Sequence, residues 1–210
     1  MVDGEIVACA SEERFTRVKN EDMYPYASIN AILNREGIDP GSLDLVVIAS
    51  ERFDATGVLC HKHSRFSVQD RLREQHEYWY PRLVLGKEVS YLDVFKDKLD
   101  VEQYPKDWGK VVDFIESGNQ RDANIFIQDF RRQVVSNHLG ISPQKIIFIH
   151  HHRAHGYHAY YGSPMEKERT LILTADAWGD DMNASVSLAE GSNIRMLSSS
   201  QNFNLARIYR

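Results

Sequence analysis

Hydrophobic and polar residues alternate in blocks along this chain, and the blocks predict strands and helices in turn. Four short apolar runs have the length and the β-branched content of buried strands. They cover residues 6–10, 43–50, 145–149 and 170–174. Residues 24–36 and 124–139 carry apolar side chains at helical spacing, and a glycine follows each stretch, which favours a helix end. The pattern predicts an α/β fold, and the first strand-helix-strand unit predicts a parallel strand pair with a right-handed crossover.

Turn signals predict two hairpins. Asp3-Gly4 precedes the first apolar run and is typical of a hairpin turn that leads into a strand. Residues 184–197 alternate in hydropathy around the turn Glu190-Gly191-Ser192-Asn193. We therefore expect a hairpin at residues 184–197 and, near the start, a hairpin turn whose first strand is missing or supplied otherwise, because only Met1 and Val2 precede it.

The middle of the chain breaks the rhythm of strands. Residues 69–98 and 104–140 are rich in charged and aromatic side chains and poor in glycine and proline, so they predict two or more helices. In the helix expected at 124–139, the inward side chains are Phe126, Ile127, Phe130 and Val134. The sequence thus predicts a single domain over residues 1–210 with a helical insertion at about 55–123.

Composition narrows the range of functions. The chain has 210 residues, 42% of them hydrophobic, a net charge of -5 and a pI near 6.0. No global basic field is present, so we expect no nucleic-acid partner. No apolar run approaches the ~20 residues of a membrane helix, so we expect no membrane partner. Cys9 and Cys60 are far apart in the sequence and fit a reducing, cytoplasmic environment.

A histidine cluster follows the apolar run 145–149 without a spacer. Residues 150–155 read His-His-His-Arg-Ala-His and continue into a stretch that can be helical. On a helix, His151 and His155 are four residues apart and share one face, where two imidazoles can bind one metal ion. Asp176 and Asp180 follow the next apolar run, and we expect them at the exit of a neighbouring strand. Asp176 would complete a two-histidine, one-carboxylate set, which suits Fe²⁺ or a similar divalent ion.

Simpler interpretations stand beside this one. A histidine cluster after a strand is often a polar cap, and short metal motifs are weakly specific. The zinc-protease version requires Glu directly after the first histidine, whereas position 152 is His. Likewise, the charged stretch that holds Glu12, Glu13, Arg14 and Lys19 is by default a solvated turn.

Two ordered motifs resemble the ATP-dependent O-carbamoyltransferases, which include nodulation-factor, aminoglycoside and cephalosporin carbamoyltransferases. The first is the stretch from Asp3 to Arg17 followed by Lys19. The second combines His151-His152-Arg153-Ala154-His155 with the stretches Ala159 to Pro164 and Leu173 to Asp180. The Asp-x-x-Gly-Asp turn that ends at Asp180 also resembles the phosphate-binding hairpins of actin and sugar kinases.

This resemblance implies a fold and a reaction. The fold would be part of an actin/sugar-kinase-like ATPase fold, with a ribonuclease H-like sheet and flanking helices. The family converts carbamoyl phosphate and ATP into carbamoyl adenylate and transfers the carbamoyl group to the hydroxyl of a small-molecule acceptor. The chain would be an incomplete amino-terminal domain, inactive alone, because the family's leading hairpin and adenylating domain have no counterpart in it. The sequence leaves a homodimer open.

The resemblance also assigns residues. His151, His155 and Asp176 would bind the metal, and Asp176, Gly179 and Asp180 would bind the nucleotide. Lys19 would stabilise developing negative charge at the carbamoyl oxygen. His152 or His158 would act as base on the acceptor hydroxyl.

Two other interpretations remain open from sequence. The H-x-x-x-H motif also occurs in tRNA threonylcarbamoyl transferases, although the Glu12-Glu13-Arg14-Phe15 stretch and the helical insertion point away from them. A noncatalytic nucleotide- or metal-binding remnant is the third class. Two positions depart from the residues that the carbamoyltransferases more typically have. Ala177 replaces a glycine in the phosphate turn, and His158 replaces a small residue on the acceptor side.

Overall fold

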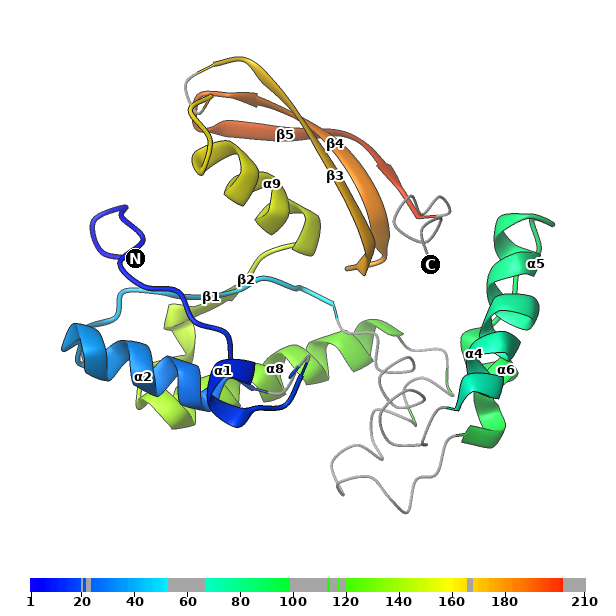
Figure 1. Cartoon of the computed structure of the whole chain (residues 1–210), viewed down its shortest axis with the longest axis horizontal. Helices are drawn as coiled ribbons and strands as arrows, with labels where there is room; N and C mark the ends of the chain where they lie inside the picture. The colour runs from blue at the N-terminus through cyan, green and yellow to red at the C-terminus, as the bar shows by residue number, and fades with distance from the viewer. Residues whose placement is uncertain are drawn as a thin grey trace. The chain divides into compact units, whose positions relative to one another are not determined.

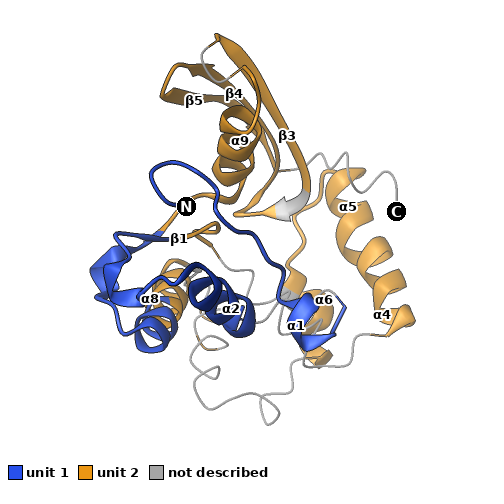
Figure 2. Ribbon diagram, turned by 60° about the vertical axis from the view of Figure 1, so that its left-hand side comes forward, with its two compact units in different colours: residues 1–46, 132–147 blue, residues 47–131, 148–210 orange. Residues whose placement is uncertain are grey.

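The computed structural model describes residues 1–19, 21, 24–52, 67–98, 113, 117, 120–165 and 168–201. The chain divides into two compact units (Figure 2). Unit 1 comprises Met1–Val46 and Arg132–Ile147, and unit 2 comprises Val47–Arg131 and Phe148–Arg210. The expected single domain with an insertion at about 55–123 stays a prediction, but within that range residues 67–98 are described and are mostly helical.

In unit 1, the carboxylate of the residue that precedes α1 caps the next helix, α2. α1 (Glu13–Thr16) is preceded by Glu12, and α2 (Tyr26–Glu36) is preceded by Pro25, which has no side-chain acceptor. The Glu12 carboxylate accepts hydrogen bonds from the N–H groups of Ala27 at 2.9 Å and Ser28 at 2.7 Å. These bonds satisfy donors that a helix N-terminus leaves without a partner. Burial would raise the pKa of Glu12, but the hydrogen bonds from Ser28 and Ala27 lower it below its usual value.

A histidine joins α2 to the end of α8 (Gln120–Leu139). The Nδ1 atom of His138 lies 2.7 Å from the Tyr24 hydroxyl, and its Nε2 atom lies 3.1 Å from Asn30 Oδ1. The ring of Tyr26 stacks on the same imidazole, with the ring centres 4.1 Å apart. The expected helix at 24–36 is confirmed, and Gly37 ends it with a φ of 64°.

The first apolar run does not form the expected strand. Asp3 and Gly4 make a turn with φ values of 49° and 86°, and Val2 and Glu5 pair across it. Residues 6–10 then run without strand structure, and Ile6 is 65% exposed. Among the described residues, no strand pairs with this run, and an apolar segment needs such a partner to become a strand.

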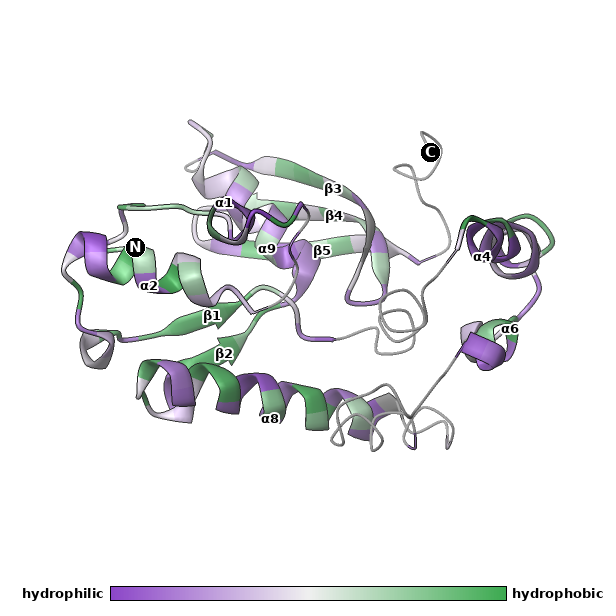
Figure 3. Cartoon of the chain, turned by 60° about the horizontal axis from the view of Figure 1, so that its bottom comes forward, coloured by the Kyte–Doolittle hydropathy of each residue, from purple (hydrophilic) through white to green (hydrophobic). Residues whose placement is uncertain are grey.

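The expected crossover pair is therefore replaced by another one. β1 (Val46–Ile48) pairs with β2 (Ile146–Phe148) in a two-stranded sheet, and the two arrows point the same way in Figure 3. The pairing extends past both strands, because the Ile149 N–H donates to the Ile48 carbonyl at 2.9 Å. Each strand is shorter than the apolar run that predicted it. In unit 1, the short helix η1 (Pro40–Ser42) precedes β1, and the short helix η6 (Pro143–Lys145) precedes β2.

The second sheet is antiparallel and has the order β3-β4-β5. Its strands are β3 (Thr170–Gly179), β4 (Met182–Glu190) and β5 (Asn193–Ser200). Asp180 and Asp181 form the β3–β4 turn with φ values of 51° and 63°, which matches a two-residue hairpin turn. The hairpin expected around Gly191 is confirmed by the pairing of β4 with β5.

One face of this sheet carries α9 (His151–Tyr161), as Figure 1 shows. Tyr160 of α9, Ile172 of β3 and Ala189 of β4 form a buried cluster, with exposed fractions of 5% or less. β2 and β3 therefore belong to different sheets. The expectation that they are neighbouring strands of one sheet is wrong for the described strands, because β2 pairs with β1 and β3 pairs with β4.

The helical expectations for the middle of the chain are confirmed at residues 67–98 and 120–139, whereas most of residues 99–119 lie outside the described residues. A helix runs through α4 (Val68–Arg73), the π-helical segment η3 (Glu74–Trp79) and α5 (Tyr80–Leu83), and α6 (Tyr91–Phe95) with η4 (Lys96–Lys98) follows. α8 alternates apolar and polar faces (Figure 3), and it buries Ile127 as expected. Phe130 is 43% exposed, so its inward assignment is wrong; Ala123 and Val135 are buried instead. Within the described residues, no helix combines the length and apolarity that crossing a membrane would take.

Candidate metal centre

The candidate site begins where β2 passes into α9. His150 precedes the helix, and its Nδ1 atom accepts a hydrogen bond from the His152 N–H at 3.2 Å. α9 therefore starts at His151, so the expected four-residue spacing puts His151 and His155 on one helical face. All residues of the site lie in unit 2.

Three side chains converge at this end of α9. The Nε2 atom of His151 lies 2.6 Å from Asp176 Oδ2, and the Nε2 atom of His155 lies 3.3 Å from the same oxygen. The two Nε2 atoms are 3.0 Å apart. Asp176 is part of β3, near the irregularity between Ala175 and Gly179, and not beyond the end of a strand as expected. The packing of α9 on the sheet brings the residues together.

These distances match a shared ion. A metal about 2.1 Å from each donor atom holds neighbouring donors about 3.0 Å apart at right angles and about 3.4 Å apart in a tetrahedron. The separations of 3.0 and 3.3 Å lie close to these values, and the 2.6 Å separation is a hydrogen-bond distance that is shorter than both. Within the described residues, this is the group of three His, Cys, Asp or Glu side chains whose ligand atoms all lie within 4.8 Å. The His155 side chain is 53% exposed, so one side of the cluster is open to solvent and to further ligands.

Gly179 leaves space for the His151 ring. A Cβ atom at this position would lie 2.0 Å from Cδ2 and 2.4 Å from Cγ of His151. Such contacts are far below van der Waals distance, so only glycine allows the imidazole to lie here. The expected role of Gly179 in nucleotide binding is untested. Its observed role is to admit a metal-ligand candidate.

Asp180 is buried, and its carboxylate accepts four hydrogen bonds. One carboxylate oxygen, Oδ1, accepts from the Ser50 hydroxyl at 3.0 Å and the Arg52 N–H at 2.7 Å. The other, Oδ2, accepts from the Glu51 N–H at 2.9 Å and the His151 N–H at 2.6 Å. Burial would raise its pKa, but these four hydrogen bonds lower the pKa below the usual value. The carboxylate is fully engaged inside the protein, and its expected role in nucleotide binding stays a prediction.

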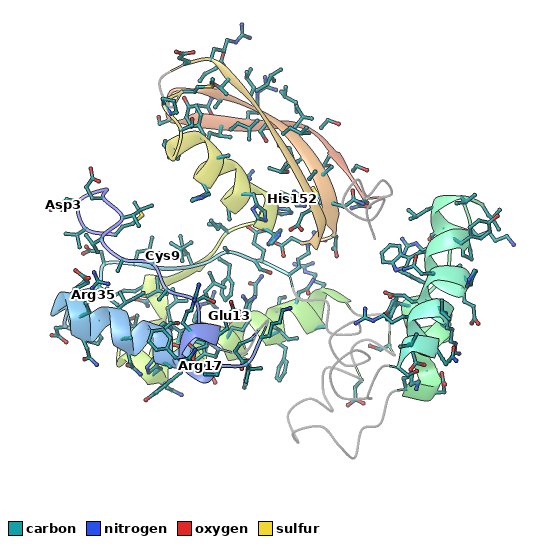
Figure 4. The ribbon with its side chains drawn as sticks, in the orientation of Figure 1. Asp3, Cys9, Glu13, Arg17, Arg35 and His152 are labelled. Atoms are coloured by element: carbon teal, nitrogen blue, oxygen red, sulfur yellow. The ribbon has the colours of Figure 1, made fainter. Side chains whose placement is uncertain are left out.

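His152 is buried against the sheet and is 1% exposed; Figure 4 labels it at the base of α9. Its Nε2 atom lies 3.1 Å from the Met182 carbonyl, which can only accept, so the proton is on Nε2. Its Nδ1 atom, 2.7 Å from Thr174 Oγ1, must then accept from that hydroxyl. Burial lowers the pKa of His152, which keeps the ring neutral. Because both nitrogens are occupied, the expected role as base on an acceptor hydroxyl does not fit.

Comparison with known proteins identifies the family of this chain. Residues 1–209 match the family model described as the carbamoyltransferase N-terminus. The chain belongs to the carbamoyltransferase family. It is also similar to the nodulation protein NolNO of Sinorhizobium fredii (strain NBRC 101917 / NGR234), with 22% identity over 195 residues. That match covers 93% of this chain and 21% of the relative, so the chain spans about a fifth of the relative's length.

Lys19, the other residue that the carbamoyltransferase resemblance assigned, lies elsewhere in the chain. It belongs to unit 1 and is exposed, shortly after the C-terminal end of α1. In the same charged stretch, the Glu12 carboxylate is buried and holds the start of α2. The signal in the sequence was the proline at the start of α2, which requires an acceptor from outside the helix.

Sequence reasoning about this carbamoyltransferase chain missed the supporting residues of the metal centre. Ser50, Glu51 and Arg52 hold Asp180, Thr174 holds His152, and the Ser185 hydroxyl is hydrogen-bonded to that of Thr174. In the sequence, serine residues alternate with apolar residues along β4. The meaning of this alternation depends on the buried histidine that faces it, which only the packing of α9 reveals.

Proposed function

We propose that this chain forms the transfer site of an ATP-dependent O-carbamoyltransferase. The reaction moves a carbamoyl group from carbamoyl adenylate, made from carbamoyl phosphate and ATP, to the hydroxyl of a small-molecule acceptor. The observation that supports it is the convergence of His151, His155 and Asp176 in a chain of the carbamoyltransferase family. Since the chain spans 21% of its curated relative, formation of the adenylate belongs, in this proposal, to a further part of the enzyme.

The three side chains fit a divalent ion, and Fe²⁺ or a similar metal is the candidate. Two imidazole nitrogens and one carboxylate oxygen leave further coordination positions, a donor set typical of non-haem iron. When bound, the metal would supply a Lewis acid and a template for the adenylate phosphate. His151 and Asp176 are partly buried and His155 is exposed, so a substrate could approach the three side chains from the side of His155.

The proposed transfer step replaces one bond to the carbamoyl carbon by another. The acceptor oxygen forms a bond to the carbamoyl carbon, and the bond from that carbon to the adenylate phosphate oxygen breaks. AMP leaves with the electron pair, and the hydroxyl proton leaves to solvent, because both nitrogens of His152 are already hydrogen-bonded. Lys19 keeps the role that the resemblance implies, stabilising negative charge on the carbamoyl oxygen.

The fold supports an ATPase-like assignment in part. The observed fold is α/β, with parallel and antiparallel strand pairs. We propose that it forms part of an actin/sugar-kinase-like fold, and the β3–β4 hairpin with its Asp-x-x-Gly-Asp turn supports this. The segment that resembles a phosphate-binding hairpin lies directly beside the candidate metal centre.

A metal titration tests the proposed site. The purified chain is titrated with Co²⁺ under reducing conditions, and d–d absorbance reports the binding. Wild-type protein should bind one equivalent, whereas His151→Ala, His155→Ala and Asp176→Ala should each lose affinity by a factor of about 100 or more. His76→Ala removes an exposed histidine of η3 and should bind like wild type. Unchanged affinity in the three site variants would remove the proposed centre.

Binding of AMP, the leaving group of the proposed step, tests the chemistry. Calorimetry should show AMP binding about tenfold more tightly to the metal-loaded chain than to the metal-free chain, because the metal would contact the phosphate. Metal binding without AMP binding would instead support the noncatalytic metal-binding class.

A further inference from the structure

Asp180 connects three segments that are distant in sequence. They are the residues after β1, the first residue of α9, and the β3–β4 turn in which Asp180 itself lies. Two donors approach each carboxylate oxygen, which uses the ~4 lone-pair positions that a carboxylate offers. Asp180 is 6% exposed. The Asp180 carboxylate therefore occupies the N-terminus of α9, where an external phosphate would otherwise bind.

A half-buried guanidinium supports the same network from α8. The Arg131 Nη1 atom donates to the Ser50 carbonyl at 3.1 Å, and its Cζ atom lies 5.2 Å from the centre of the Phe148 ring. Burial lowers the pKa of Arg131, and the negative charge of Asp180 opposes this shift. Arg131 thus holds the segment whose Ser50 hydroxyl and Arg52 N–H hold Asp180.

We propose that Asp180 and Arg131 are positioning residues that fix His151 for metal binding. Asp180 fixes the backbone of His151 through the 2.6 Å hydrogen bond to its N–H. Arg131 fixes Asp180 indirectly, through the Ser50–Arg52 segment. This inference rests on the proposed function only in that His151 binds a metal.

The His151 ring is constrained at two points by the same turn. Gly179 contacts the imidazole from one side, and Asp180, the next residue, holds the backbone N–H. If the hydrogen bond weakens, the helix start can move relative to β3, and the Nε2 atom leaves its 2.6 Å position beside Asp176 Oδ2. Metal affinity should therefore depend on residues that do not contact the metal.

Asp180→Asn is the decisive variant. Asparagine tolerates the positive φ of 51° at this position, so the substitution adds no backbone strain. Its amide nitrogen would face two of the four donors, whose hydrogen bonds are lost. Asp181→Asn is the matched control: it occupies the same turn, has a φ of 63° and pairs with Arg52 at the exposed surface.

The experiment is Co²⁺ titration of both variants and of wild type, with circular dichroism to check the fold. Asp180→Asn should bind Co²⁺ about 10 to 100 times more weakly and shift the d–d band, while Asp181→Asn should match wild type. Equal affinity of Asp180→Asn and wild type would overturn the inference. Failure of wild-type protein to bind Co²⁺ would instead overturn the proposed function.

Arg131 provides a second route if Asp180→Asn does not fold. Arg131→Gln should weaken Co²⁺ binding by about threefold to tenfold, and Arg131→Lys should restore most of the affinity because lysine can still donate to the Ser50 carbonyl. A loss of stability to urea in Arg131→Gln with no change in Co²⁺ affinity or spectrum would show a purely structural role and overturn the assignment.

Discussion

At the scale of single residues, the site depends on what surrounds its ligands. His151, His155 and Asp176 are the proposed donors, but Gly179 makes room for one imidazole and Asp180 fixes its backbone. His152 shows the opposite case, since a histidine inside the same cluster serves to attach α9 to the sheet. A side chain's role in this cluster is thus set by its environment and not by its type.

Gly179→Ala should weaken metal binding. The new Cβ atom would lie 2.0 Å from His151 Cδ2, so the ring must move away from Asp176. We expect Co²⁺ affinity to fall about tenfold or more in the titration described above.

Gly156→Ala is the control for this substitution. Gly156 is buried in α9, and its Cβ atom would meet Ile172 Cγ2 at 3.7 Å, an ordinary contact. It should keep wild-type affinity and stabilise the helix by up to about 1 kcal/mol. Wild-type Co²⁺ affinity in Gly179→Ala would contradict the steric argument.

At the scale of elements, local hydrogen bonds set where helices begin. α4 starts with a capping box: the Ser67 hydroxyl accepts from the Asp70 N–H at 3.2 Å, and the Asp70 carboxylate accepts from the Ser67 N–H at 2.7 Å. Lys98 Nζ lies 3.0 Å from the same carboxylate. The aromatic residues Tyr78, Tyr91 and Phe95 then pack η3 against α6.

The start of α4 should loosen at low pH. Burial would raise the pKa of Asp70, but hydrogen bonds from Ser67 and the Lys98 charge lower the pKa from 3.8 to about 2. Because the folded pKa lies below the unfolded one, the stabilisation from Asp70 is present above pH 4 and is lost as the pH falls towards 2.

Hydrogen exchange of residues 67–73, corrected for intrinsic rates, measures this loss. Protection in wild-type protein should fall between pH 4 and pH 2, whereas Asp70→Asn should have lower protection at pH 5 and little change below it. Parallel pH profiles for the two proteins would contradict the assignment to Asp70.

At the scale of the whole molecule, the β3-β4-β5 sheet has two different faces. Ile172 faces α9 and is 5% exposed, while its neighbours Leu171 and Leu173 are each 67% exposed on the opposite face. In the part of the chain that the structure describes, β3 is an edge strand. An apolar face beside an unpaired edge favours association.

Charges on the open face should reduce self-association. The double variant Leu171→Lys with Leu173→Lys should show a smaller apparent mass than wild type in light scattering at high concentration, with an unchanged urea midpoint. Ile172→Ala should instead lose roughly 2–5 kcal/mol of stability, because it removes a buried side chain from the cluster with Tyr160. Equal apparent masses for wild type and the double variant would contradict the prediction.

Much of the secondary structure could be read from local patterns. The helix at α2, the turn at Gly191 and the helical spacing of His151 and His155 depend on neighbours within a few residues. The strand at 6–10 failed because a strand depends on a partner that lies elsewhere. The hydrogen bonds of Asp180 could not be predicted for the same reason, since its donors at Ser50–Arg52 lie 128 to 130 residues away in the sequence.

The sequence by itself determined the donor types, their spacing on one helix and the family to which the chain belongs, because side-chain chemistry and helical periodicity are local properties. Only the tertiary structure decided which carboxylate meets the imidazoles. The packing of α9 on β3 brings Asp176 to His151 and His155. The same packing takes up the Asp180 oxygens in hydrogen bonds, because a buried carboxylate needs donors, and here they come from the residues after β1 and the start of α9.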